Sequence, residues 1–139
     1  MLKLLFTLTA VVALWTPLIA GPDEFGLGTI DLPSTTKDYP KRGVDSAVGT
    51  LISTDGTPDI RYDIGQGPTT FPELKPAEYI FLKTGQLNGF DYRAIIYSSD
   101  PRQLAFFLVK PRFAGFTATI NSEIERDQVL KILLKYRPK

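Results

Sequence analysis

The residues of this chain best suited to chemistry lie in two short segments near its middle. Asp45 and Ser46 stand in the segment R-G-V-D-S-A-V-G, and Tyr62 and Asp63 stand in the segment R-Y-D-I-G. Two carboxylates brought together across a cleft can perform acid–base chemistry or bind a cation. We therefore predict Asp45, Ser46, Tyr62 and Asp63 as ligand-binding residues, provided that the fold brings the two segments together.

Each of these residues also has a structural interpretation. Asp45 and Ser46 come directly before a predicted strand, where a short acid and a hydroxyl can bond neighbouring backbone N–H groups and fix the strand entry. Alternation along the second segment places Tyr62 in the core and Asp63 on the opposite face, as a solvated surface acid. The sequence leaves both interpretations open.

The chain contains no His and no Cys. Imidazole is therefore excluded as a general base or metal ligand, and zinc sites and Cys or Ser–His catalysis are excluded with it. An enzyme would have to work with carboxylates, Lys, Tyr or a lone hydroxyl. These absences favour a non-catalytic protein without metal or cofactor, held together by core packing rather than by disulfides.

The first twenty residues have the pattern of a cleavable secretory signal. Lys3 gives a positive start, an uncharged apolar run follows, Pro17 breaks it, and Ala20 is a small residue suited to a cleavage site. A retained anchor is the alternative, but a span takes roughly 20 apolar residues, more than this run offers. We predict a signal peptide over residues 1–20 and a secreted or periplasmic protein with no stable membrane insertion after cleavage.

The remaining residues, 21–139, are enough for a single domain. The leader contains one of the 16 Lys and Arg residues and none of the 15 acids, so the domain is expected to be electrically neutral. A neutral domain has no single-sign field to attract nucleic acid. We expect a protein or small-molecule partner outside the cytoplasm and no nucleic acid.

Short apolar runs separated by Pro and Gly predict a series of strands. They cover residues 25–32, 47–53, 59–64, 78–87, 90–98, 102–110 and 113–120. The Asn88-Gly89 pair predicts a type I′ hairpin turn. Residues 33–42 and 65–76 are expected as loops, the second long for so small a domain.

The end of the chain predicts an amphipathic helix. Ser122 and Glu125 have the spacing of a capping box, and Pro138 is expected to stop the helix. Val129, Ile132, Leu133 and Tyr136 share one face at helical spacing, and Leu130 and Leu134 widen it. The expected fold is α+β: an antiparallel meander of about six or seven strands with this helix packed on one face.

The segments around Asp45 and Asp63 resemble a pairing found in small exported bacterial proteins without assigned function. The shared features are G-[IV]-D-S-x-V-G followed by Y-D-I-G, and the resemblance covers roughly residues 28–136. It implies export but no known activity. The order of strands ending in a capped helix also resembles the PsbP-type α/β/α sandwich, which implies a binding or assembly module.

Aromatic side chains crowd the second half of the chain. Phe106 and Phe107 are adjacent on a predicted strand, so they point to opposite faces and both faces need cover. One helix cannot cover both, so a short helix over residues 71–79, a curled sheet or a partner must do so.

Three functions from different classes fit these observations. They are a non-catalytic binding or accessory module, a small-ligand carrier with an aromatic-lined cavity, and a carboxylate-based glycan hydrolase using acids such as Asp45, Asp63 and Glu78.

Overall fold

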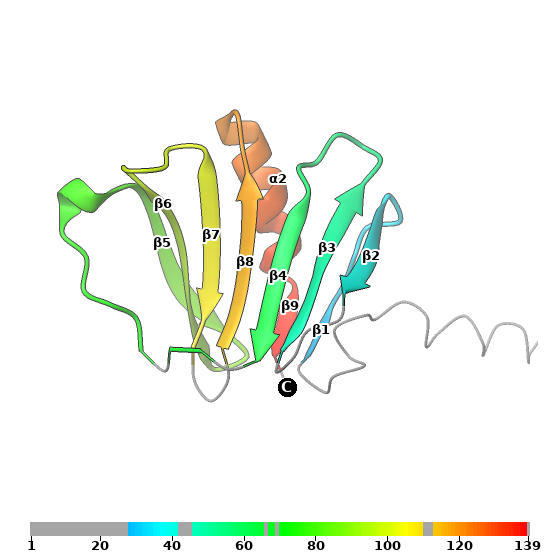
Figure 1. Cartoon of the computed structure of the whole chain (residues 1–139), viewed down its shortest axis with the longest axis horizontal. Helices are drawn as coiled ribbons and strands as arrows, with labels where there is room; N and C mark the ends of the chain where they lie inside the picture. Colours follow the sequence, from blue (N-terminus) through cyan, green and yellow to red (C-terminus); the bar gives the residue numbers. More distant parts are fainter. Residues whose placement is uncertain (1–27, 42–45, 66, 69, 110–112, 139) are drawn as a thin grey trace, which may run out of the picture.

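The computed structural model describes residues 28–41, 46–65, 67–68, 70–109 and 113–138. The predicted signal peptide and Asp45 lie outside these residues. The described residues form a seven-stranded sheet, a two-stranded sheet, one short 3-10 helix and one α-helix (Figure 1). The elements in chain order are β1 (Gly28–Ile30), β2 (Thr36–Lys41), β3 (Ala47–Ser53), β4 (Ile60–Gly65), η3 (Pro76–Glu78), β5 (Tyr79–Leu87), β6 (Phe90–Tyr97), β7 (Gln103–Leu108), β8 (Phe113–Thr119), α2 (Glu123–Leu133) and β9 (Tyr136–Pro138).

The large sheet has the strand order β2-β3-β4-β8-β7-β6-β5, and every neighbouring pair is antiparallel. Two meanders, β2 to β4 and β5 to β8, are therefore joined through the pair β4–β8. The short strands β1 and β9 pair antiparallel and form the second sheet. Residues 70–75 lie outside the sheet on its β5–β6 side and lead to η3 (Figure 1).

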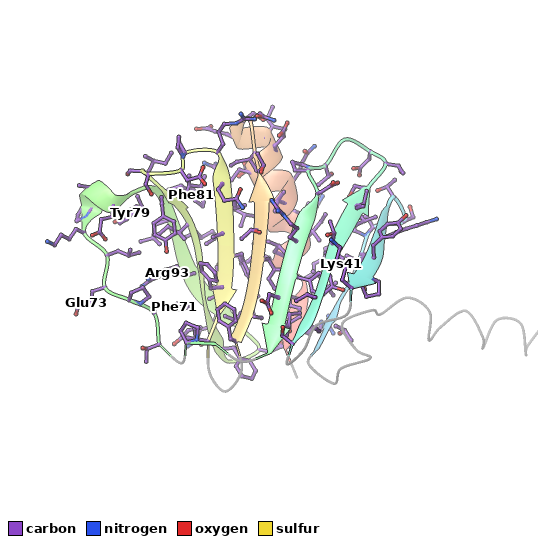
Figure 2. The ribbon with its side chains drawn as sticks, viewed as in Figure 1. Lys41, Phe71, Glu73, Tyr79, Phe81 and Arg93 are labelled. Carbon is purple, nitrogen blue, oxygen red and sulfur yellow. The ribbon has the colours of Figure 1, made fainter. Side chains whose placement is uncertain are left out.

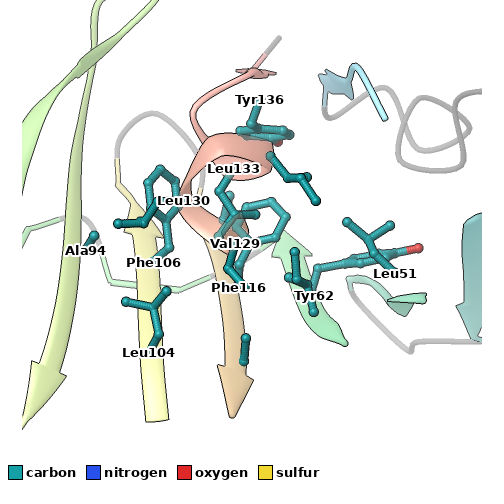
Figure 3. Close-up of a cluster of buried hydrophobic side chains, with 14 of the residues drawn as sticks. Leu51, Tyr62, Ala94, Leu104, Phe106, Phe116, Val129, Leu130, Leu133 and Tyr136 are labelled. Carbon is teal, nitrogen blue, oxygen red and sulfur yellow. The ribbon is translucent and has the colours of Figure 1, made fainter. Parts of the chain in front are cut away.

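The core lies on one face of the large sheet, which we call the core face. Tyr62 of β4, Phe116 of β8 and Phe106 of β7 form a row across three strands, because Tyr62 and Phe106 both lie opposite Phe116. Their ring centroids are 6.5 Å and 6.0 Å apart, and the ring of Tyr136 meets Phe116 edge-on at 5.2 Å. Buried side chains of α2, including Val129, belong to the same cluster (Figure 3).

The start of α2 follows the expected capping chemistry with one difference. Ser122 is the N-cap, and its Oγ accepts a hydrogen bond from the Glu125 backbone N–H at 3.1 Å. The return bond goes one residue further back, because Glu125 Oε1 accepts from the Asn121 backbone N–H at 3.0 Å. No helix within the described ranges is long and apolar enough to cross a bilayer.

The predicted α+β class and the antiparallel sheet are confirmed. Residues 47–53 form β3 as predicted, and Asn88 and Gly89 have φ of 50° and 83°, the positive values that a type I′ turn requires. The single meander is wrong, because β8 pairs with β4 as well as with β7. Such a long-range pairing leaves no local signal in the sequence.

Two local predictions are also wrong. Residues 33–42 were expected as a loop, but Thr36–Lys41 forms the edge strand β2, where Pro40 is tolerated because an edge strand has N–H positions that need no partner. Tyr136 was expected on the helix and Pro138 as its stop, but α2 ends at Leu133 and both residues belong to β9. Tyr136 still lies in the core, where it is buried and its ring meets that of Phe116.

Candidate functional site

The structure separates the predicted site residues that it describes. Tyr62 is buried on the core face, whereas Asp63, its neighbour on β4, is exposed on the opposite face, which we call the outer face. Ser46 is half-buried directly before β3. Asp45 lies outside the described residues, so its distance from Asp63 stays untested, and ligand binding by these four residues stays a prediction.

The two sequence segments meet through packing. Gly49 of β3 lies directly opposite Tyr62 of β4. A Cβ atom at Gly49 would collide with Tyr62 Oη and would lie 2.5 Å from Cζ, so only glycine leaves room for the ring. The Tyr62 hydroxyl donates to Asp38 Oδ1 on β2 at 2.7 Å. Tyr62 thus ties three strands together, which gives it a structural role.

This geometry predicts a strong coupling between Gly49 and Tyr62. Gly49→Ala is expected to lower the free energy of unfolding by about 1–3 kcal/mol, because the ring must move into a packed core. In a double-mutant cycle with Tyr62→Leu, measured by urea unfolding, the added cost of the alanine should fall but not vanish, because a Cβ at Gly49 would also lie 2.8 Å from the Tyr39 carbonyl oxygen. Additive losses would show that the ring does not fill the space above Gly49.

Asp63 and Glu78, two of the acids named for glycan hydrolysis, do not form a pair suited to it. Asp63 lies on β4 and Glu78 directly precedes β5, with three strands between them. At roughly 4.8 Å per strand they are about 19 Å apart, beyond the roughly 5–9.5 Å that such chemistry needs. Among the described residues, no three carboxylates gather closely enough to hold a metal ion.

A pocket of about 210 Å³ lies on the outer face, beneath the segment between β4 and β5. Its floor consists of Phe107, Val109 and Phe113, with the rings of Phe107 and Phe113 stacked at 5.9 Å. The remaining lining residues are Pro68, Thr70, Phe71, Pro72, Arg93 and Tyr97. The outer face of β7 is therefore covered by a loop, and an apolar hollow remains under it.

Two glycines shape this pocket. A Cβ at Gly67 would lie 2.7 Å from Cβ of Phe113, and a Cβ at Gly115 would lie 2.9 Å from its Cζ. The Phe113 ring therefore rests between the loop and the sheet. It holds the loop above the outer face at one end of the pocket.

Arg93 of β6 holds the loop at the other end. Its Nη1 donates to the Pro72 carbonyl at 2.7 Å, and its guanidinium carbon lies 4.6 Å from the centre of the Phe71 ring. Figure 2 shows Arg93 and Phe71 together on the loop side of the sheet, far from Lys41 on β2. The pocket thus combines an apolar floor with one cationic wall.

No protein-family model, curated protein or solved structure matches this chain. Its function is therefore inferred from the geometry of its own residues.

Two other hollows are less suited to a specific ligand. One of about 310 Å³ lies beside the start of α2, where the guanidinium of Arg126 stacks on Phe81 at 4.3 Å and also pairs with Asp127 at 3.0 Å. The other, of about 610 Å³, is a wide polar groove that includes Asp59 and Arg61 and so carries both charges. Both are more open to solvent than the outer-face pocket, and the first contains a second cation, Arg102, that already donates to the Asn121 side-chain oxygen.

Hydrogen bonds shift the pKa of Asp55, and its role is structural. The Thr57 backbone N–H donates to its Oδ1 at 3.0 Å and the Thr35 hydroxyl to its Oδ2 at 2.8 Å, and these bonds lower the pKa of Asp55. The ionised carboxylate therefore stabilises the turn between β3 and β4 at neutral pH. This contribution is lost as the pH falls through the lowered pKa.

The sequence prediction missed Arg93 as a functional residue. The signal was present, because alternation along β6 places Arg93, Ile95 and Tyr97 on the face away from Tyr92 and Ala94. The path of the residues between β4 and β5 leaves no such signal in the sequence. Without knowledge of that path, Arg93 has the sequence pattern of an ordinary exposed cation.

Proposed function

We propose that this protein is an exported, non-catalytic binding module that holds a small ligand with a flat apolar group in the outer-face pocket. In this proposal α2 packs on the core face and closes it, so the outer face is left for the ligand. The observation that carries the proposal is the aromatic hollow under the loop, with Phe107 and Phe113 as its floor. An apolar cavity with a few polar groups is the usual form of a small-molecule site.

The size of the pocket limits the ligand. Its volume is below the roughly 300–1,000 Å³ of sites for drug-sized molecules, so a single ring with a short substituent is the expected occupant. At about 0.4 kcal/mol per heavy atom, a ten-atom probe gains about 4 kcal/mol, which corresponds to a Kd of about 1 mM. The physiological ligand is expected to bind more tightly because it makes further contacts at the rim.

Both edge strands of the large sheet are unsuited to pairing with another strand, which favours binding on a face of the sheet instead. The edge strand β2 carries Pro40 between Lys37 and Lys41 on a half-exposed strand. The other edge strand, β5, carries Lys83 and a register shift near its start. Proline, lysine and bulges all oppose the addition of another strand.

A plugging variant tests this function. Val109→Phe places a ring into the pocket, and we expect it to abolish the NMR-detected binding of phenylacetate and phenylacetamide that the wild type shows at millimolar concentration. Val48→Phe is the matched control, because Val48 lies on the outer face of β3, away from the pocket. Retained binding in Val109→Phe, or no binding by the wild type, would contradict the proposal.

Export is tested separately. We expect the amino terminus of the protein purified from its native cell to begin near Gly21, because the leader over residues 1–20 is removed. Edman sequencing of that protein measures this directly. A native protein that still begins at Met1 would contradict export while leaving the pocket proposal intact.

A further inference from the structure

We infer that the ligand of the outer-face pocket carries a carboxylate, and that Arg93 is the residue that recognises it. This inference rests on the proposed function, because it names the chemistry of the ligand for the same pocket. Arg93 is half-buried and lines the wall of the pocket above an apolar floor.

Arg93 has no acidic partner among the described residues. Within the part of the chain that the structure describes, the one ion pair within 4.0 Å joins Arg126 and Asp127. A half-buried cation is costly unless an anion or several hydrogen bonds compensate the lost water. The Pro72 carbonyl and the Phe71 ring supply part of that compensation, and neither carries a negative charge.

The Arg93 side chain also has an unused hydrogen-bond donor. Arg93 Nε is buried and has no hydrogen-bond partner among the described residues. Leaving a buried donor unpaired is unfavourable, so native proteins rarely do so without a reason. A carboxylate can accept from the planar guanidinium through both oxygens, which would satisfy this group and the charge together.

The burial of Nε sets a condition for binding. Because this atom has no contact with solvent, a carboxylate bonds to it only after the Arg93 side chain or the residues over the pocket shift. An acid with a flat ring fits this arrangement, because its ring can lie on Phe107 and Phe113 while its carboxylate faces Arg93. The inferred ligand is therefore a small aromatic monocarboxylate.

The test compares phenylacetate with phenylacetamide, which have the same ring and differ in charge. At pH 7 the acid is ionised, because carboxyl groups of this kind have a pKa near 4. By NMR titration we expect the wild type to bind phenylacetate at least tenfold more tightly than phenylacetamide. Arg93→Met should remove this preference, so that the acid binds no more tightly than the amide, whose own binding weakens because the bond from Arg93 to the Pro72 carbonyl is lost.

Two further variants make the result specific. Arg61→Met removes an exposed cation from the outer face of β4 and should keep the full preference. Arg93→Lys keeps a charge without the planar fork and should retain part of it. It also provides the comparison if Arg93→Met unfolds, which its NMR spectrum would show.

The results that would overturn the carboxylate inference differ from the result that would overturn the proposed function. Equal affinity of the wild type for both probes, or a preference that survives in a folded Arg93→Met, would overturn the carboxylate inference and leave the pocket proposal standing. A parallel loss of both probes in Arg93→Met would also overturn it, because Arg93 would then only hold the loop. No binding of either probe to the wild type would remove the proposed function itself.

Discussion

Phe116→Ala is expected to lower the free energy of unfolding by about 3–5 kcal/mol. The Phe116 side chain is 1% exposed and lies at the centre of the aromatic row between Tyr62 and Phe106, with Tyr136 against its ring. Truncation removes the ring contacts on three sides and leaves a cavity that strands on both sides of β8 hold open. For a domain with roughly 5–15 kcal/mol of net stability, this is a large fraction of the total.

Urea unfolding followed by circular dichroism measures this loss as a lower midpoint with an unchanged slope. Phe107→Ala is the matched control, since Phe107 is half-buried on the outer face and stacks mainly on Phe113. We expect the control to lose clearly less stability. If Phe107→Ala costs as much as Phe116→Ala, the assignment of the core to one face is wrong.

Ile132→Ala in α2 is expected to cost about 2–5 kcal/mol. Ile132 is 5% exposed and belongs to the cluster that contains the buried side chains of the sheet. The helix spans Glu123–Leu133, and a helix of 11 residues is marginal in water without tertiary contacts. The loss therefore reports how strongly the helix depends on its contacts with the core.

Ile124→Ala is the control within the same helix. Ile124 is 72% exposed, so its truncation should change the free energy of unfolding by no more than about 0.5 kcal/mol. Thermal unfolding of the two variants side by side is sufficient. Similar losses at both positions would mean that the apolar face of the helix has been assigned incorrectly.

Local patterns were enough to predict much of the fold. The alternation of Ile60, Tyr62 and Ile64 with charged neighbours gave β4 and its buried face, and those three side chains are buried as expected. The Asn88-Gly89 turn and the Ser122 cap depend on neighbours in the chain, so they too could be predicted.

The features that were missed depend on contacts between distant residues. Lys37 and Lys41 made residues 33–42 look like a loop, because an edge strand with exposed side chains has little apolar pattern. The pairing of β8 with β4 joins residues far apart in the chain. Tyr136 had helical spacing, but its contact with Phe116 is made from β9.

The candidate site likewise combines a feature that the sequence indicated with contacts between distant residues that it did not indicate. The sequence pointed to Tyr62 through a pair of motifs. Gly49, the glycine that ends the first motif, is needed for packing because it leaves space for the Tyr62 ring of the second. The aromatic content suggested a lined cavity, but the pocket arises only where the loop is fastened by Arg93 and Phe113. Residues on separate elements define that pocket, so its place on the outer face could not be predicted.

The most direct test of the central claim is a set of intermolecular NOEs between bound phenylacetate and the isotope-labelled wild-type protein. We predict contacts from the ring protons of the probe to the Val109 methyl groups and to the rings of Phe107 and Phe113. Contacts confined to exposed apolar residues elsewhere, such as Ile80 or Ile124, would contradict the account and would place binding away from the outer-face pocket.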